Sequence, residues 1–84
     1  MNYNDKEYVK KKILKLISLL EQLRAGVDEY KELALKIQLA YDLTGDEGLI
    51  NILNNTRTAY DKAVDQYNEN VVMINKHIKR YNEM

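Results

Sequence analysis

A heptad repeat of apolar residues runs through each half of this chain, and the two repeats together restrict the fold most. The first repeat follows a 4-3-4-3 spacing and consists of Val9, Ile13, Leu16, Leu20, Leu23, Val27, Tyr30, Ala34, Ile37 and Tyr41. The second follows a 3-4-3-4 spacing and consists of Ile50, Leu53, Arg57, Tyr60, Val64, Tyr67, Val71, Ile74, Ile78 and Tyr81. A period of about 3.5 residues keeps one side of a helix facing a partner helix. The sequence therefore predicts an all-α, coiled-coil-like fold of two helices.

A turn separates the two repeats, at Leu43-Thr44-Gly45-Asp46-Glu47-Gly48. Gly45 can take the left-handed conformation that ends a helix, and Asp46 or Thr44 can cap the next one. A turn this short makes the two helices antiparallel neighbours. The chain therefore predicts an antiparallel two-helix hairpin.

The 84 residues allow one domain, and we expect it to span residues 1–84. The expected boundaries are a first helix over about 5–42, a turn over 43–48 and a second helix over about 47–82. Asn4 or Asp5 is expected to cap the first helix. The heptad phase passes through Gly26 unbroken, which favours a continuous helix, while a bend or break at Gly26 stays open.

The chain has more apolar residues outside the two repeats than the contact between two helices can bury. Leu19, Leu33 and Ala40 share one heptad position beside the first repeat, which widens its apolar stripe. We expect a second hairpin, from another copy or another protein, to complete a four-helix bundle. The candidate partner-interface residues are Leu14, Ile17, Leu19, Leu33, Ala40, Leu43 and Gly45.

No catalytic, cofactor-binding or metal-binding set is predicted. The chain has no Cys and a single His, and His77 has no converging partners, so we expect a solvated histidine and no enzymatic activity. Carboxylate pairs such as Asp28 with Glu32 could hold a divalent ion, but solvation and pairing with neighbouring lysines is the favoured interpretation. The seven Tyr are interpreted as amphipathic core residues, with interface anchoring as the alternative.

Charge is balanced in total, with 13 basic and 13 acidic residues, which argues against a nucleic-acid partner. No apolar run is long enough to predict a membrane span. The hairpin should gather acidic residues at the turn and eight basic residues at the open end, which either solvate it or dock an acidic protein surface or anionic lipid. These eight are Lys6, Lys10, Lys11, Lys12, Lys15, Lys76, Lys79 and Arg80.

Leu43-Thr44-Gly45 stands where the small helical-hairpin proteins of type VII secretion carry Trp-x-Gly, and the chain resembles that WXG-like family in length and outline. Gly45 matches the motif glycine and Leu43 replaces the tryptophan. The family's export signal, Tyr-x-x-x-Asp/Glu, finds no match after the second helix, because Tyr81-Asn82-Glu83-Met84 ends before the acidic position. The spacing from Tyr3 to Glu7 does match, but at the other end of the chain.

These departures fit best the helical partners of LXG toxins, which resemble WXG proteins while often lacking the motif. The resemblance implies an accessory protein that binds the helical targeting region of a toxin. We expect a cytoplasmic protein; the first residues, MNYNDKEYVKKK, lack the order of a signal peptide, so export, if it occurs, would use no cleaved signal of that type. Two alternatives stay open: a structural homo-oligomeric bundle, and a small phage or mobile-element regulator that acts by protein contact.

Overall fold

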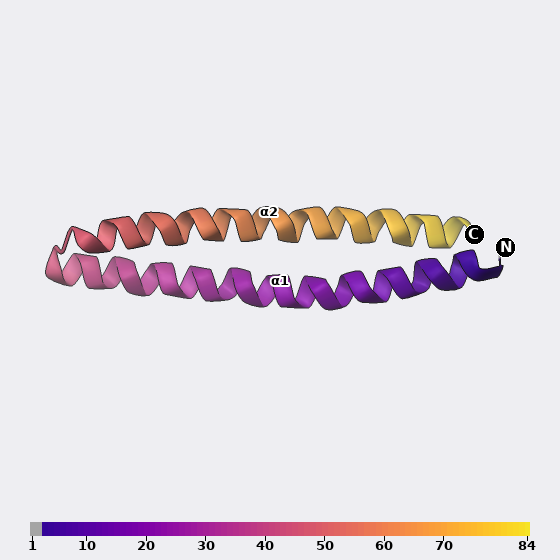
Figure 1. Ribbon diagram of the computed structural model, residues 1–84, viewed down its shortest axis with the longest axis horizontal. Coiled ribbons are helices and arrows are strands. Elements are labelled where there is room, and N and C mark those ends of the chain that lie inside the picture. Colours follow the sequence, from indigo (N-terminus) through magenta and orange to yellow (C-terminus); the bar gives the residue numbers. More distant parts are fainter. Residues whose placement is uncertain (1–2) are drawn as a thin grey trace.

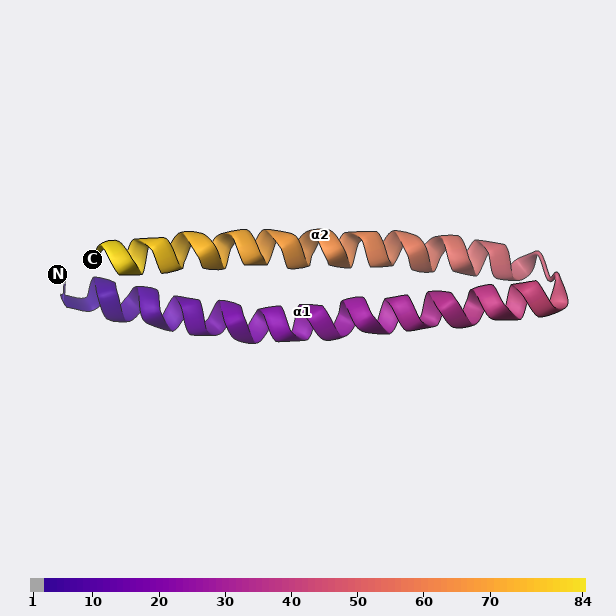
Figure 2. The same ribbon diagram turned by 180° about the vertical axis from the view of Figure 1, so that it is seen from behind.

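The computed structural model describes residues 3–84 and consists of two helices, α1 (Tyr3–Thr44) and α2 (Gly48–Glu83). They run antiparallel and side by side, and the two ends of the chain lie at the same end of the rod (Figures 1 and 2). The rod measures 63 × 16 × 14 Å along its principal axes. The predicted all-α antiparallel hairpin is therefore confirmed. α1 extends two residues beyond each expected boundary, and α2 begins and ends one residue later than expected.

The turn is held by the residues that the sequence singles out. Gly45 has φ of 67° and its N–H donates to the Tyr41 carbonyl at 2.7 Å, which is a left-handed helix end. The Thr44 hydroxyl accepts the Asp46 N–H at 3.2 Å. The Asp46 carboxylate in turn accepts the Gly48 N–H at 2.9 Å, at the start of α2. Of the two expected capping side chains, Asp46 therefore binds the first N–H of α2, whereas Thr44 binds within the turn.

α1 is one continuous helix through Gly26, so the chain neither breaks nor reverses there. Both ribbon views show a gentle bow in α1 and no kink (Figures 1 and 2). A methyl group added at Gly26 would meet nothing within 4 Å, so no close approach requires a glycine at this position. The expected cap is wrong: α1 begins at Tyr3, and Asn4 and Asp5 lie inside the helix.

The first heptad repeat forms the inner face of α1, as predicted. Val9 and Ile37 are buried, and most other members of the repeat are half-buried. Tyr30 is the exception, with 38% of its surface exposed. A strict 3.5-residue repeat thus places nearly all of its members between the helices.

The inner face of α2 differs from the prediction. Its buried residues are Leu53, Thr56, Ala63, Asn70 and Ile74. Leu53 and Ile74 belong to the predicted repeat, whereas Thr56, Ala63 and Asn70 each lie one residue before a predicted member. Arg57 and Ile78 are exposed, and Ile50, Val64 and Val71 are half-buried beside the inner face. The predicted second repeat is therefore wrong at Arg57 and Ile78, while Thr56, Ala63 and Asn70 take inner positions that the prediction did not assign.

The small and hydrogen-bonding character of the inner residues explains the difference. Ala63 is small, and the Thr56 hydroxyl donates to the Ile52 carbonyl at 2.8 Å within its own helix. The Asn70 side-chain amide donates to the Leu16 carbonyl across the hairpin, also at 2.8 Å. Buried polar groups are tolerated when they are hydrogen-bonded in this way. Between Leu53 and Ile74, α2 therefore turns Thr56, Ala63 and Asn70 toward α1 and leaves Val64 and Val71 at the rim.

Candidate functional site

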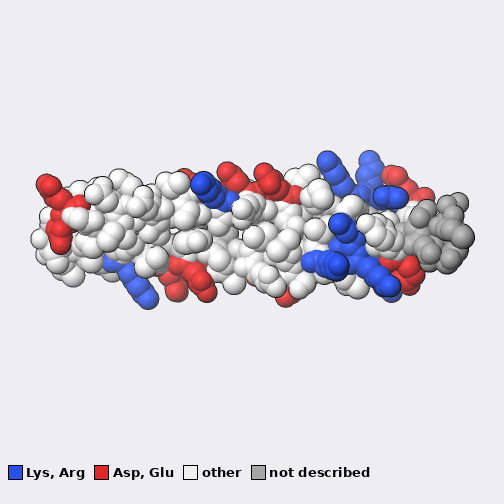
Figure 3. All heavy atoms as spheres, viewed as in Figure 1, with Lys and Arg blue, Asp and Glu red and all other residues white. Residues whose placement is uncertain are grey.

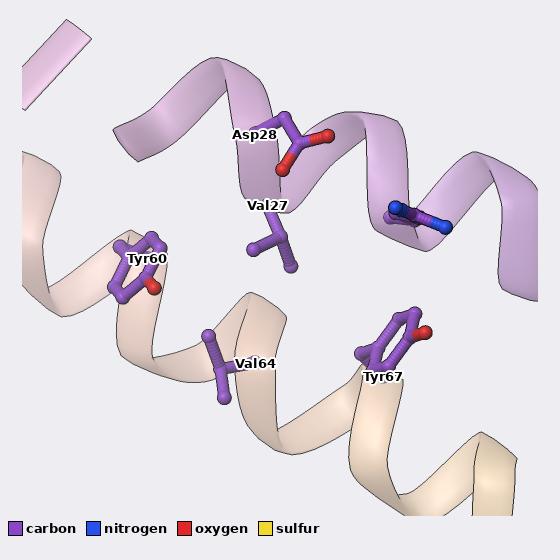
Figure 4. A pocket seen from close by; sticks show the side chains of 6 residues that line it. Val27, Asp28, Tyr60, Val64 and Tyr67 are labelled. Atoms are coloured by element: carbon purple, nitrogen blue, oxygen red, sulfur yellow. The ribbon is translucent and has the colours of Figure 1, made fainter. Parts of the chain in front are cut away.

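A groove runs along one side of the hairpin, and we call it the tyrosine groove. Its central part is lined by Arg24, Val27 and Asp28 from α1 and by Tyr60, Val64 and Tyr67 from α2. Figure 4 shows Val27 pointing toward α2 and Val64 standing between the two tyrosine rings. The groove continues toward the turn past Lys31, Ala34, Leu35, Gln38 and Arg57. Val27 with Val64, and Ala34 with Arg57, each line one stretch of this groove.

Gln38 connects the two helices along the tyrosine groove. The Arg57 guanidinium donates to the Gln38 Oε1 at 3.1 Å. The Gln38 Nε2 donates to the Asp42 carboxylate at 3.0 Å, one turn further along α1. Arg57 is thus placed over Ala34 with its charged end among exposed polar groups, as its long side chain permits.

The opposite side of the hairpin carries a second groove, which we call the methionine groove. Its lining residues are Leu16, Leu19 and Leu23 from α1 and Gln66, Glu69, Asn70 and Met73 from α2. Leu19 is nine residues from Asp28, and Met73 is nine residues from Val64. Nine residues are two and a half helical turns, so each pair points to opposite sides of its helix. The two grooves therefore lie on opposite faces.

The structure divides the predicted interface residues between these faces. Leu14 and Ile17 lie two and one heptads before Asp28 and Arg24, on the side of the tyrosine groove. Leu33 and Ala40 lie two and three heptads after Leu19, on the side of the methionine groove. The four leucine and isoleucine candidates are all exposed, with relative accessibilities of 57% for Leu14, 39% for Ile17, 44% for Leu19 and 46% for Leu33. Ala40 is half-buried.

The two remaining candidates belong to the turn and not to a groove. Leu43 is 83% exposed in the last turn of α1. Gly45 has a sufficient structural reason for its presence, because its positive φ is a conformation that other residues rarely adopt. Sequence reasoning also missed, as interface candidates, groove residues that the geometry adds, among them Arg24, Asp28, Gln66, Glu69 and Met73. Pairing the residues that flank the two heptad repeats, instead of the repeats alone, would have indicated these groove residues.

Charge is distributed unevenly along the rod. Figure 3 shows basic side chains over both helices near the open end and acidic side chains at the turn end. The open end also contains Glu7 and Glu83, so its basic cluster is interrupted by acids. Lys6 extends from α1 to α2, where its ammonium lies 4.9 Å from the centre of the Tyr81 ring. The rod therefore has a predominantly basic open end and an acidic turn.

His77 contradicts its expected role as a solvated residue. The side chain is half-buried, and its Nε2 atom is buried without a hydrogen-bond partner among the described residues. It lies seven residues after Asn70, so it continues the polar inner column of α2. Among the residues whose side chains the structure describes, no group of three or more His, Cys, Asp or Glu could hold a metal ion. No helix in this part of the chain is long and apolar enough to cross a membrane.

No family model matches the chain, and neither the curated proteins nor the solved structures give a match.

Proposed function

We propose that this protein is a non-enzymatic interaction module whose methionine groove receives a helical segment of another protein. The observation that carries the proposal is the row of exposed apolar side chains along this groove. Leu19 and Leu33 are exposed on α1, and Met73 and Ile52 on α2, with accessibilities of 43% and 50%. Exposed leucines at heptad spacing are typical of a surface that binds an amphipathic helix.

The free energy available from such a contact is substantial for a small protein. Fully burying one Leu side chain contributes roughly 1.5 to 3 kcal/mol. A typical domain has a stability of only about 5 to 15 kcal/mol. Covering Leu19 and Leu33 together would therefore add a meaningful fraction of that amount. A Met side chain adapts its shape readily, which suits a groove that accepts a foreign helix.

We propose more narrowly that the segment is the helical targeting region of an LXG-type toxin and that the protein is an accessory of type VII secretion. Two features support this: the long antiparallel hairpin, and the position of Leu43 and Gly45 at its turn. In this proposal the protein acts in the cytoplasm and leaves the cell, if at all, without a cleaved signal peptide. Leu43 at the exposed tip would then be free to contact the secretion machine.

A binding experiment with matched leucine variants tests the proposal. The tagged full-length chain is used to recover partners from its native host, and the recovered toxin segment is then titrated against purified variants. Leu33→Asp should abolish binding, because it places a carboxylate on the rim of the methionine groove. Leu39→Asp is the control, since Leu39 is 61% exposed and lies six residues further, on the outer face of α1.

The outcomes separate the general proposal from the narrow one. Recovery of a partner other than a toxin, with binding lost in Leu33→Asp alone, would retain the interaction module and refute the secretion role. Equal binding by both variants would refute the methionine groove as the binding surface.

A further inference from the structure

We propose that the tyrosine groove is a self-association surface on which a second copy of this chain docks in the antiparallel sense, with its turn beside the open end of the first. The inference deepens the proposed function, since it rests on the hairpin working by association and names a second partner on the opposite face. Two exposed columns of α1 border this groove. One consists of Lys10, Ile17, Arg24, Lys31 and Gln38, and the other of Leu14, Glu21, Asp28, Leu35 and Asp42.

These two columns are complementary to each other when α1 is laid antiparallel on its own copy. With residue 26 as the centre, Arg24 faces Asp28 of the second copy, Lys31 faces Glu21, and Lys10 faces Asp42. In the same alignment Ile17 faces Leu35. Every charged member meets an opposite charge, and no charge meets an apolar residue. Opposite charges arranged in this way fix the orientation and the alignment of an interface.

The fifth pair places Gln38 against Leu14, and it leaves no amide unsatisfied. Gln38 already accepts from Arg57 and donates to Asp42 within one chain. The Leu14 side chain can therefore cover the aliphatic part of Gln38 without breaking a hydrogen bond. All ten residues of the two columns belong to the exposed or half-buried surface, so each is available to a second copy.

In α2, the residues at heptad spacing before and after Val64 lie at the rim of the hairpin, and they can be paired by the same symmetry. With Val64 as the centre, Ile50 faces Ile78 and Val64 faces its own copy, whereas Arg57 faces Val71, so the match in α2 is apolar at the centre and the ends only. The symmetry centres of the two helices are neighbours, because Val27 and Val64 line the same stretch of groove (Figure 4). One two-fold axis through that point therefore relates both helices to their copies. Such an interface is closed, since the same patch serves both partners.

The charge distribution decides between the two ways in which hairpins can stack by two-fold symmetry. With turn beside turn, the basic open ends of both copies would meet and repel each other. With turn beside open end, the acidic turn, which includes Asp42, would lie against the basic open end, which includes Lys10, of the other copy. Both stackings make every adjacent helix antiparallel, as in an up-and-down four-helix bundle, so the charges and not the helix directions distinguish them. The balanced total charge adds no net repulsion between copies.

Charge exchange at the central pair tests this arrangement in the full chain. Arg24→Asp alone and Asp28→Arg alone should each sediment as monomers at micromolar concentration, because each sets like charges against each other across the axis. An equimolar mixture of the two variants should recover the dimer mass, because every pair is again opposite. Glu29→Arg is the matched control: it makes the same charge change one residue away, toward the other face of α1, and should stay dimeric.

Cross-linking tests the position of the axis independently. The chain contains no Cys, so Val64→Cys and Val72→Cys each introduce a single thiol. Val64→Cys should form a disulfide-linked dimer on mild oxidation, since its two copies meet at the axis. Val72→Cys should not, since Val72 is exposed on the outer face of α2.

A monomeric wild-type chain at micromolar concentration, charge variants that dimerise like wild type, or failure of the mixture to recover the dimer would each overturn the proposal. Cross-linking through Val72 instead of Val64 would also overturn it. Binding of another protein to the methionine groove by the monomeric Arg24→Asp variant would leave the proposed function intact. Loss of that binding in Leu33→Asp, with the dimer retained, would separate the two surfaces.

Discussion

The side-chain amide of Asn70 donates a hydrogen bond to the main-chain carbonyl of Leu16, 2.8 Å away on the opposite helix. Asn70 is only 6% exposed, so its amide has lost nearly all contact with water. A single buried Asn in a coiled-coil seam fixes the alignment of two helices, because any shift leaves the amide without a partner. This contact explains why α2 presents a polar residue to α1 while Val71 stays at the rim.

Replacing this asparagine should therefore destabilise the hairpin. Asn70→Ala removes the hydrogen bond and leaves a small cavity, and we expect a loss of about 1 to 2 kcal/mol of unfolding free energy. Urea denaturation followed by circular dichroism measures it. Asn68→Ala serves as the control, since Asn68 is exposed two residues earlier and should change stability by less than about 0.5 kcal/mol. Equal losses in the two variants would contradict a specific role for Asn70.

The glycines of α1 and of the turn should respond in opposite directions to alanine. Gly26→Ala should raise the free energy of unfolding by about 0.5 to 1 kcal/mol, because the added methyl group meets nothing within 4 Å and favours the helix. Gly45→Ala should lower it by about 1 to 2 kcal/mol, because Gly45 has a positive φ of 67°. Thermal unfolding of both variants measures the contrast. A stability gain in Gly45→Ala would contradict the left-handed helix end.

The half-buried imidazole of His77 should be replaceable by an apolar side chain. Its Nε2 lies buried without a hydrogen-bond partner among the described residues, and such a group costs about 1 to 3 kcal/mol. His77→Leu should therefore raise the midpoint of urea unfolding, whereas Lys76→Leu at the exposed neighbouring position should leave it nearly unchanged. A lower midpoint in His77→Leu would mean that the imidazole has a stabilising partner.

The stability of the helix packing near the turn should depend on Leu53 and not on Leu43. Leu53 is buried at 5% exposure, so Leu53→Ala should cost about 2 to 3 kcal/mol. Leu43→Ala makes the same chemical change at a highly exposed position and should be nearly neutral. Denaturant midpoints compare the two, and a similar shift in both variants would contradict the observed packing.

The sequence predicted the turn and the inner face of α1 because each depends on local signals. The turn depends on Gly45, Thr44 and Asp46, and the inner face of α1 on an unbroken apolar repeat. The inner face of α2 could not be predicted from hydrophobicity alone. Val64 is more apolar than Ala63, yet the smaller residue packs between the helices. Which residues of α2 face α1 depends on side-chain size and on the hydrogen bond that Asn70 donates to Leu16 on the other helix. Neither can be recognised from the sequence of α2 alone.

Five of the seven predicted interface residues are exposed apolar side chains, but the seven lie on two faces and at the turn and do not form one surface. The heptad repeat of α1 places Leu19 and Ile17 on either side of the inner face of this helix. Only the packing against α2 shows that a groove forms on each side. His77 was misplaced for the same reason as the α2 repeat, since it lies in the inner column that hydrophobicity overlooks.

The central claim is that the two faces of the hairpin bind different partners, and two leucines separate them most directly. Leu33 and Leu35 are two residues apart, both exposed, and lie beside the methionine and tyrosine grooves respectively. Sedimentation equilibrium of the full chain at micromolar concentration should give a dimer for Leu33→Asp and a monomer for Leu35→Asp. Identical masses for the two variants, whether both monomeric or both dimeric, would contradict the assignment of separate partners to the two faces.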